Sequence, residues 1–383
     1  MYGFYSDQLQ YDHTYDGVTF LVGPNGSGKT RLLRQIALYR SKRNHATRII
    51  CNTPFDRYVG IRGSAVRLSA RSDSSKPVEV LKQAILLAFG NKSSSVGRLR
   101  NILDYSGYDS QVEIQPVGVD ANRIRNIGEA AVSLGKGTET NHIQAMASYL
   151  MEHRYNSEWL SLDGDLGKHV FSEFALDMLR WESVLKRARF IKRIDLNLVR
   201  KHDGMVISMK DGSSGELTLI AALSFLISHM DYECSILIDE PENSLHPAWQ
   251  RSYIDRILAV TSLWRPEIII ATHSPLIVSG AQVLDNIRTR IFRVDGKNTQ
   301  LVKVDGDGME ETLWDVFDTI TPSNHFLSVR LVEIIKLVKQ SRATRAWAFQ
   351  EIGRLEDAAY SHDQARLFQA ARGLINQLIG DKL

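Results

Sequence analysis

The stretch Val18–Thr30, VTFLVGPNGSGKT, decides the fold class of this 383-residue chain. Its first five residues form an apolar, β-branched run that predicts a buried strand. The next eight, Gly23–Thr30, fit the phosphate-binding pattern GxxxxGK[ST] in full, and the spacing from Thr30 to Arg40 predicts a helix. A strand that passes through a glycine-rich loop into a helix is the opening of a nucleotide-binding α/β domain.

The loop supplies what a nucleoside triphosphate needs. Its glycines let backbone amides turn toward the phosphates, and the helix N-terminus adds partial positive charge. Lys29 is expected to reach the β- and γ-phosphates, and the Thr30 hydroxyl to hold Mg²⁺. The residues expected to bind ATP here are Gly23, Pro24, Asn25, Gly26, Ser27, Gly28, Lys29 and Thr30.

Composition excludes several other classes of protein. The chain is 24% charged and 43% hydrophobic with a formal net charge of +3, which is ordinary globular composition. We find neither a signal peptide nor an apolar run of about 20 residues, so we expect a cytoplasmic protein without a membrane segment. The two cysteines, Cys51 and Cys234, are expected to be buried free thiols, and without a CxxC pair no zinc hook is available.

A second acidic motif lies far downstream. Ser235–Ile238 is an apolar run that predicts a strand, and it ends in Asp239 and Glu240. Asp239 is expected to hold the Mg²⁺ shell, and Glu240 to act as general base toward the attacking water. The alternative is that the two carboxylates only cap the next helix.

The pattern along the chain predicts four regions. Residues 1–71 form the N-terminal part of an ATPase head, 72–204 a mostly helical insertion, 205–310 the C-terminal part of the head, and 311–383 a helical C-terminal region. Further elements are predicted as helices over Ser214–His229 and Pro247–Ser262, and as strands over Glu267–Ala271, Arg290–Val294 and Leu301–Val304.

Three short motifs, one before and two after Asp239 and Glu240, carry a family resemblance. Asp211–Glu216, DGSSGE, resembles the signature of ABC ATPases; Glu242–Pro247, ENSLHP, resembles their D-loop; and ATHSP resembles their switch segment, with His273 as the histidine. The resemblance covers residues 17–57 and 205–295. It implies an ABC ATPase head of the P-loop NTPase fold. The signature residues that it places against ATP are Ser213, Ser214, Gly215 and Glu216.

The resemblance implies a dimer that sandwiches two ATP·Mg²⁺. Each site would combine the phosphate loop, Asp239, Glu240 and His273 of one subunit with the signature of the other. DEPENSLHP together with ATHSP resembles the RecF, SMC and OLD-like ATPases rather than transporter subunits. The compact size, the NTPFDRY segment and the SSGE signature look like the PtuA-like ATPases of Septu and retron-associated anti-phage systems. Such ATPases imply a separate effector, typically an HNH nuclease, in some systems with a reverse transcriptase and its DNA.

The sequence departs from this pattern in one place and leaves alternatives open. A lid glutamine is not obvious, and Gln111 and Gln115 are weak candidates. No HNH, zinc or Toprim pattern is found, and the acidic turn Asp305–Gly308 reads as a hairpin. The basic segment Lys186–Lys201 could contact nucleic acid or simply face water. A DNA-repair clamp and a module that uses ATP to hold a toxin inactive remain alternatives, and assembly beyond a dimer is left open.

The C-terminal aromatic residues have two interpretations. Trp314, Phe317, Phe326 and Trp347 are expected to form core rather than a docking surface for a partner.

Overall fold

The computed structural model describes residues 17–69, 76–90, 94–125, 138–152, 156–163, 170–284, 287–296, 298–303, 309–317, 325–357 and 362–380. The chain divides into two compact units. The first comprises residues up to 33, 250–252 and 269–383, and the second comprises 34–249 and 253–268. The boundaries of the four regions predicted from the sequence differ from those of these two units, and the four-region division stays a prediction.

The first unit contains the opening strand of the chain. Its strands run in the order β11-β10-β1-β9, with bounds β1 (Gly17–Val22), β9 (Glu267–Ala271), β10 (Arg288–Asp295) and β11 (Asn298–Val302). β1 and β10 are parallel, and β10 and β11 form an antiparallel hairpin. Val18, Phe20, Leu21 and Val22 are fully buried, as the apolar run predicts. The phosphate loop follows β1 directly and leads into α1 (Lys29–Lys42).

The second unit holds a parallel layer and the helix that covers it. The strands β2 (Thr47–Cys51), β3 (Ala65–Ser69) and β8 (Ser235–Asp239) are parallel, in the order β8-β2-β3. Helix α8 (Ser214–His229) packs on β2 and β3, and α2 (Lys76–Gly90), α3 (Ser94–Tyr105) and α10 (Tyr253–Thr261) pack on α8. Because α8 is covered on several sides, its residues 219–226 are all buried.

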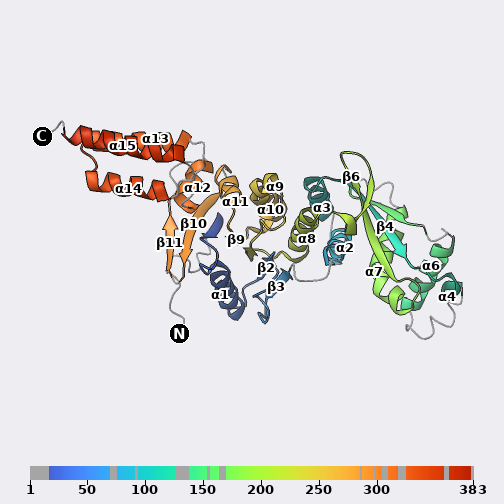
Figure 1. The fold of residues 1–383 in the computed structure, drawn as a ribbon. Coiled ribbons are helices and arrows are strands. Elements are labelled where there is room, and N and C mark those ends of the chain that lie inside the picture. Colours follow the sequence, from blue (N-terminus) through green and yellow to red (C-terminus); the bar gives the residue numbers. More distant parts are fainter. Residues whose placement is uncertain are drawn as a thin grey trace. The chain divides into compact units, whose positions relative to one another are not determined.

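A four-stranded antiparallel sheet lies in the same unit, at the other end of it in Figure 1. Its order is β5-β4-β6-β7, with bounds β4 (Tyr108–Val117), β5 (Glu158–Ser161), β6 (Arg193–Arg200) and β7 (Val206–Ser208). The accompanying helices are α4 (Ala121–Arg125), α6 (Thr138–Glu152) and α7 (Val170–Arg187). The sequence pattern predicted no sheet here, although β4 alternates buried and more exposed residues along its whole length.

One predicted helix is interrupted. Instead of a single helix over Pro247–Ser262, the structure has α9 (Pro247–Arg251), α10 and a short 3₁₀ turn η4 (Ser262–Trp264). The backbone of Arg251 lies so close to Gly280 of α11 (Pro275–Gln282) that a Cβ at Gly280 would collide with it. This close backbone packing accompanies the break, which residue spacing alone does not reveal.

The C-terminal helices form a small core of their own in the first unit. They are α12 (Met309–Phe317), α13 (His325–Lys339), α14 (Arg345–Asp357) and α15 (His362–Gly380), and the last three lie side by side (Figure 1). Their buried residues are Trp314, Leu327, Leu331, Ile334, Val338, Ala348, Ile352, Leu355, Phe368, Ala371 and Ile375. Of the aromatic residues predicted for the core, Trp314 lies in it, Phe317 is half-buried and Trp347 is 36% exposed. The side chain of Phe326 is outside the described residues.

Two expectations from composition can be compared with the fold. Cys51 and Cys234 are buried free thiols, as predicted. In the described part of the chain, no helix is both long and apolar enough to cross a bilayer. The predicted hairpin turn at Asp305–Gly308 lies outside the described residues.

Candidate functional site

The phosphate loop is built from close backbone contacts that only certain residues permit. Gly23 has φ +145°, and a Cβ there would lie 2.5 Å from the carbonyl oxygen of Val294. The carbonyl of Ser27 accepts a hydrogen bond of 2.9 Å from the amide of Gly296, in the β10–β11 turn. The loop is therefore fixed at both its start and its middle by the neighbouring hairpin.

Lys29 is the only cation of the loop, and it is nearly buried, with 4% of its surface exposed. Its Nζ donates to the carbonyl oxygens of Gly23, at 2.9 Å, and Pro24, at 3.3 Å. These bonds fold the side chain back over its own loop. The ammonium group is thereby held beside the backbone amides that would surround a phosphate chain.

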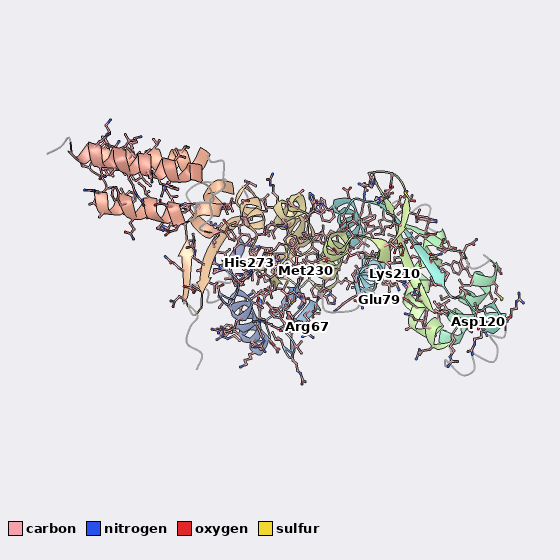
Figure 2. All side chains as sticks on the ribbon, viewed as in Figure 1. Arg67, Glu79, Asp120, Lys210, Met230 and His273 are labelled. Atoms are coloured by element: carbon pink, nitrogen blue, oxygen red, sulfur yellow. The ribbon has the colours of Figure 1, made fainter. Side chains whose placement is uncertain are left out.

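His273, which is labelled in Figure 2, lies directly against this ammonium group. Its Nε2 is 2.6 Å from Lys29 Nζ, although the two residues are 244 positions apart. An ammonium group has donors and no lone pair, so Lys29 donates in this contact and the ring nitrogen accepts. The structure therefore brings the histidine of the ATHSP motif to the lysine of the phosphate loop.

The chain around His273 explains why it is held there. Thr272, just before it, donates its amide to the carbonyl of Leu21 in β1, at 3.1 Å. Ser274, just after it, caps α11 by accepting from the amide of Ile277 at 3.3 Å. His273 is thus fixed between the end of a buried strand and the start of a helix.

The acidic strand end lies in the second unit. Asp239 is fully buried at the end of β8, and its main-chain carbonyl accepts from the amide of Asn52 at 3.1 Å. Glu240 has φ +52°, a left-handed conformation that costs a non-glycine residue free energy. Ser244, in the turn that follows, is also left-handed with φ +69°. Such conformations persist where the surroundings fix them.

Sequence reasoning missed the residues that surround Asp239. Tyr58 is fully buried, and Asn243 donates its side-chain amide to the carbonyl of Asn52 at 3.2 Å. Burial raises the pKa of the Tyr58 hydroxyl well above its ordinary value, and the nearby charge of Asp239 raises it further. The signal was present in NTPFDRY, where Asp56 accepts from the amide of Tyr58 at 2.8 Å and so turns the tyrosine inward.

The signature segment forms the N-terminus of α8, as predicted. Ser213 is the N-cap residue, and its Oγ accepts from the amide of Glu216 at 3.3 Å. Glu216 Oε2 in turn accepts from the amide of Ser213 at 3.0 Å, which completes a capping box. Ser213 and Ser214 are exposed, whereas Gly215 is buried.

Gly215 joins the signature to the D-loop segment. A Cβ at this position would collide with the carbonyl oxygen of Ser244. The start of α8 and the turn after Glu240 therefore touch through backbone, and a glycine is required at the contact. Two motifs that the sequence placed in order along the chain thus meet in space.

The metal and lid assignments can be tested in part. Among the described residues, no group of three or more His, Cys, Asp and Glu side chains is placed to hold a metal ion. The fully buried carboxylate of Asp239 at a strand end fits a divalent cation that brings its own phosphate and water ligands. Gln111 and Gln115 both belong to β4 of the four-stranded sheet, where Gln115 accepts from Asn197 at 3.1 Å.

Several cations of the basic segment Lys186–Lys201 are already paired. Lys186 contacts Glu182 at 3.0 Å, and Arg193 contacts Asp195 at 2.9 Å. Arg200 contacts Asp203 at 2.6 Å, and Lys201 contacts Asp104. These ion pairs favour the interpretation of a solvent-facing, internally neutralised surface over a phosphate-binding one.

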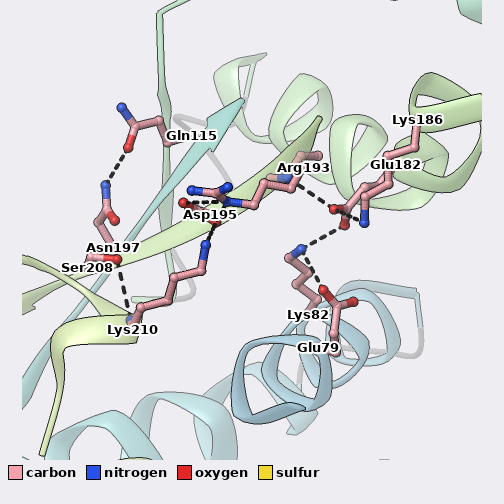
Figure 3. A network of polar contacts seen from close by, with 11 residues as sticks. Glu79, Lys82, Gln115, Glu182, Lys186, Arg193, Asp195, Asn197, Ser208 and Lys210 are labelled. Carbon is pink, nitrogen blue, oxygen red and sulfur yellow. Dashed lines mark hydrogen bonds and ion pairs between the residues drawn. The ribbon is translucent and has the colours of Figure 1, made fainter. Parts of the chain in front are cut away.

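A buried ion network ties α2 to α7 in the second unit (Figure 3). Lys82 Nζ lies 2.8 Å from Glu182 Oε2, and the two side chains are 5% and 8% exposed. Glu182 also accepts from the amide of Ile194 at 3.0 Å. Burial raises the pKa of Glu182, but the hydrogen bonds from Lys82, Lys186 and that amide lower it more. The net pKa lies below the ordinary 4.5.

Comparison with known proteins gives one family match. A family model described as "AAA domain, putative AbiEii toxin, Type IV TA system" matches residues 137–279. That range contains the signature, Asp239, Glu240 and His273 and begins after the phosphate loop. No curated protein matches the chain.

Solved structures give a weaker likeness. The Smc head domain with an extended coiled coil, bound to the C-terminal domain of ScpA, from Pyrococcus furiosus is 12% identical with a TM-score of 0.29; the match covers 75% of this chain and 90% of that one. VirB4 of Thermoanaerobacter pseudethanolicus is 8% identical with a TM-score of 0.27; the match covers 80% and 94%. At these TM-scores the likeness carries no argument. The family match shows that residues 137–279 resemble an AAA-type ATPase domain. The structure itself shows an α/β fold of the P-loop kind, in which a buried strand leads through a glycine-rich loop into a helix.

Proposed function

We propose that this chain is an ATP-hydrolysing subunit that dimerises around two ATP·Mg²⁺ and regulates a separate effector protein. The observation that carries the proposal is the contact of 2.6 Å between Lys29 and His273. It joins a phosphate-holding cation to an imidazole that can respond to the γ-phosphate. A histidine held at this point distinguishes a nucleotide-sensing site from a loop that only binds phosphate.

Each residue has a definite role in this proposal. The amides of Gly23–Gly28 and the Lys29 ammonium hold the phosphates, and Thr30 and Asp239 hold Mg²⁺. Bound Mg²⁺ would neutralise charge on the phosphate oxygens. Glu240, which follows Asp239 in a left-handed backbone conformation, takes the proton of the attacking water. His273 contacts the γ-phosphate, so that the loss of this phosphate on ATP hydrolysis changes the environment of the imidazole.

The turn over Asp211–Glu216, the signature turn, supports a composite site. The capping box occupies the Ser213 hydroxyl and the amide of Glu216, and leaves the amides of Ser214 and Gly215 as the donors of the first turn. Ser214 is exposed, Gly215 is buried, and Asp211–Glu216 contains no cation of its own. A second subunit that presents its γ-phosphate there would complete the set, and two identical contacts would form a symmetric dimer.

Mixing two inactive variants tests the composite site. Lys29→Ala removes the phosphate clamp and Ser214→Arg blocks the signature turn, so each protein alone should be inactive. Half of randomly paired dimers are mixed, and each mixed dimer has one intact site. We therefore expect hydrolysis to recover to at most about a quarter of the wild-type rate. No recovery, with mixed dimers verified by differential tags, would contradict the proposal.

The effector is the finer part of the proposal. The compact head, the SSGE signature and the NTPFDRY segment favour a PtuA-like anti-phage ATPase whose partner is a nuclease of the HNH type. A pull-down of tagged Glu240→Gln from the native host, with mass spectrometry, tests this. A co-purifying nuclease, with or without a reverse transcriptase and its DNA, would support it. A dimer carrying DNA alone would instead favour a repair-type clamp.

The family match favours one second candidate. Because the matching model is described as a putative toxin of a toxin–antitoxin system, the chain could use ATP to hold a toxin inactive. That function needs a stable ATP-bound complex and very slow turnover. A turnover number unchanged by removal of the co-purifying protein would count against it.

A further inference from the structure

A short segment, held by hydrogen bonds and an ion pair, connects the four-stranded sheet to the signature turn. β6 and β7 are antiparallel neighbours, and β7 ends at Ser208, directly before the 3₁₀ turn η3 (Met209–Asp211) that precedes the signature. Lys210 in this turn donates its amide to Ser208 Oγ at 3.4 Å and places its Nζ 2.5 Å from Asp195 of β6 (Figure 3). The approach to α8 is therefore fixed to the sheet.

A side chain of the same sheet also contacts the signature itself. Tyr108, the first residue of β4, donates its hydroxyl to Glu216 Oε2 at 2.8 Å, and the tyrosine is 3% exposed. The register between β4 and β6 shifts after Tyr108: Tyr108 pairs with Arg200, but Val112 pairs with Leu198. Such a bulge redirects side chains, and bulges are common beside functional sites.

The contacted oxygen is the one that caps the helix. Glu216 Oε2 accepts both from Tyr108 and from the amide of Ser213. The tyrosine hydroxyl therefore holds the carboxylate in its capping position. Burial raises the pKa of Tyr108, and the hydrogen bond to Glu216 raises it further, so the hydroxyl keeps its proton and remains a donor.

A displacement at Glu216 would reach the D-loop segment. Glu216 follows Gly215, whose backbone packs against the carbonyl of Ser244 with no room for a Cβ. Because packed backbone cannot deform gradually, a shift of the first turn of α8 has to move the turn after Glu240 as well.

We propose that Tyr108 is a positioning residue that couples the four-stranded sheet to the signature turn and thereby sets the rate of ATP hydrolysis. This rests on the proposed function of the signature as the part of the site that a second subunit supplies. In this proposal, a shift of β4 would act through Tyr108 on the signature turn and change the turnover of a site on the other subunit.

The test uses tyrosine-to-phenylalanine variants of the full chain. Tyr108→Phe keeps the ring and removes only the donor, and we expect kcat to fall about tenfold, with unchanged affinity for a fluorescent ATP analogue. Tyr149→Phe is the matched control, because Tyr149 donates to Glu158 at 2.5 Å within the same sheet region and is also buried. It should leave kcat and affinity unchanged.

A double-mutant cycle separates coupling from general damage. Glu216→Ala should lower kcat, and adding Tyr108→Phe to it should cause no further loss, because both changes break the same contact. A kcat within twofold of wild type for Tyr108→Phe, an equal loss for Tyr149→Phe, or fully additive losses in the cycle would each overturn the proposal. The mixing experiment with Lys29→Ala and Ser214→Arg is done first. If it gives no recovery, the proposed function has failed rather than the coupling.

Discussion

The phosphate loop and the signature turn are both loops that end in a helix N-terminus, yet they are equipped differently. The phosphate loop carries Lys29, buried against its own carbonyls and against His273, and no acidic residue. The signature turn, Asp211–Glu216, carries two acidic residues and no cation, and its cap is a serine–glutamate pair. Under the proposed function, the first binds phosphate by itself, and the second adds donors to a phosphate that the other subunit already holds.

This difference separates binding from turnover. Changes in the phosphate loop should remove nucleotide from the protein altogether. Changes in the signature turn should leave binding intact and affect what happens after two subunits meet.

The largest effect is expected at Lys29. Lys29→Ala removes the only cation of the phosphate loop, and affinity for ATP should fall about 100-fold, with no measurable hydrolysis. Lys210→Ala is the control, because it also removes a lysine, directly before the signature turn that begins at Asp211. Fluorescence titration should give wild-type affinity for Lys210→Ala. An equal loss in both variants would end the distinction between the two loops.

The buried network of the second unit is the next test. Glu182→Gln removes the buried partner of Lys82 and leaves it only the half-exposed carboxylate of Glu79, at 3.1 Å, so the free energy of unfolding should fall by about 2 kcal/mol. Asp177→Asn on the same helix breaks only an exposed pair with Arg180 and should cost less than about 0.5 kcal/mol. Urea unfolding of both proteins measures the difference.

The same network gives a pH dependence of stability. The pKa of Glu182 is lowered in the folded protein, so its contribution is present above the ordinary value of 4.5. It is lost as pH falls from there through the lower folded pKa. Wild type should therefore lose its advantage over Glu182→Gln on acidification. An advantage that grows as pH falls would contradict this sign.

A methyl group in the signature should have a smaller effect, on turnover alone. Gly215→Ala places a Cβ against the Ser244 carbonyl, and kcat should fall about tenfold with unchanged affinity for ATP. Gly353→Ala in α14 is the matched control, because nothing lies within 4 Å of the added Cβ. Steady-state kinetics on both would show whether the effect belongs to the contact.

The smallest effect is expected at the helix caps. Ser213→Ala removes the cap of α8, and Thr344→Ala removes the hydroxyl that accepts from the amide of Trp347 at the start of α14. Each should lower the free energy of unfolding by about 1 kcal/mol. Only Ser213→Ala should also change kcat, and a change in both would show that turnover responds to stability in general.

Local sequence patterns predicted those helices and strands whose formation depends mainly on residues close in sequence. The strand before the phosphate loop, the helix over Ser214–His229 and the strand over Glu267–Ala271 lie where periodicity predicted them. The order of motifs also indicated that His273 belongs with the phosphate loop, and the contact with Lys29 places it there.

Other features depend on contacts that no local pattern reveals. Tyr108 and Glu216 are 108 positions apart, and nothing near either of them indicates the other. The break after Arg251 accompanies the close approach of Gly280, from a different helix. The four-stranded sheet was missed for another reason. Its strand β4 shows the alternation of a half-buried strand, but surrounding segments with helical spacing dominated the interpretation.

The most direct test of the central claim is sedimentation of Glu240→Gln with and without ATP·Mg²⁺. Without its general base, the protein should bind ATP and fail to release it by hydrolysis. We expect a monomer without nucleotide and a stable dimer at saturating ATP·Mg²⁺, and Lys29→Ala added to it should abolish the dimer. A protein that binds ATP and remains monomeric would contradict the account, because the signature turn would then have no phosphate to complete.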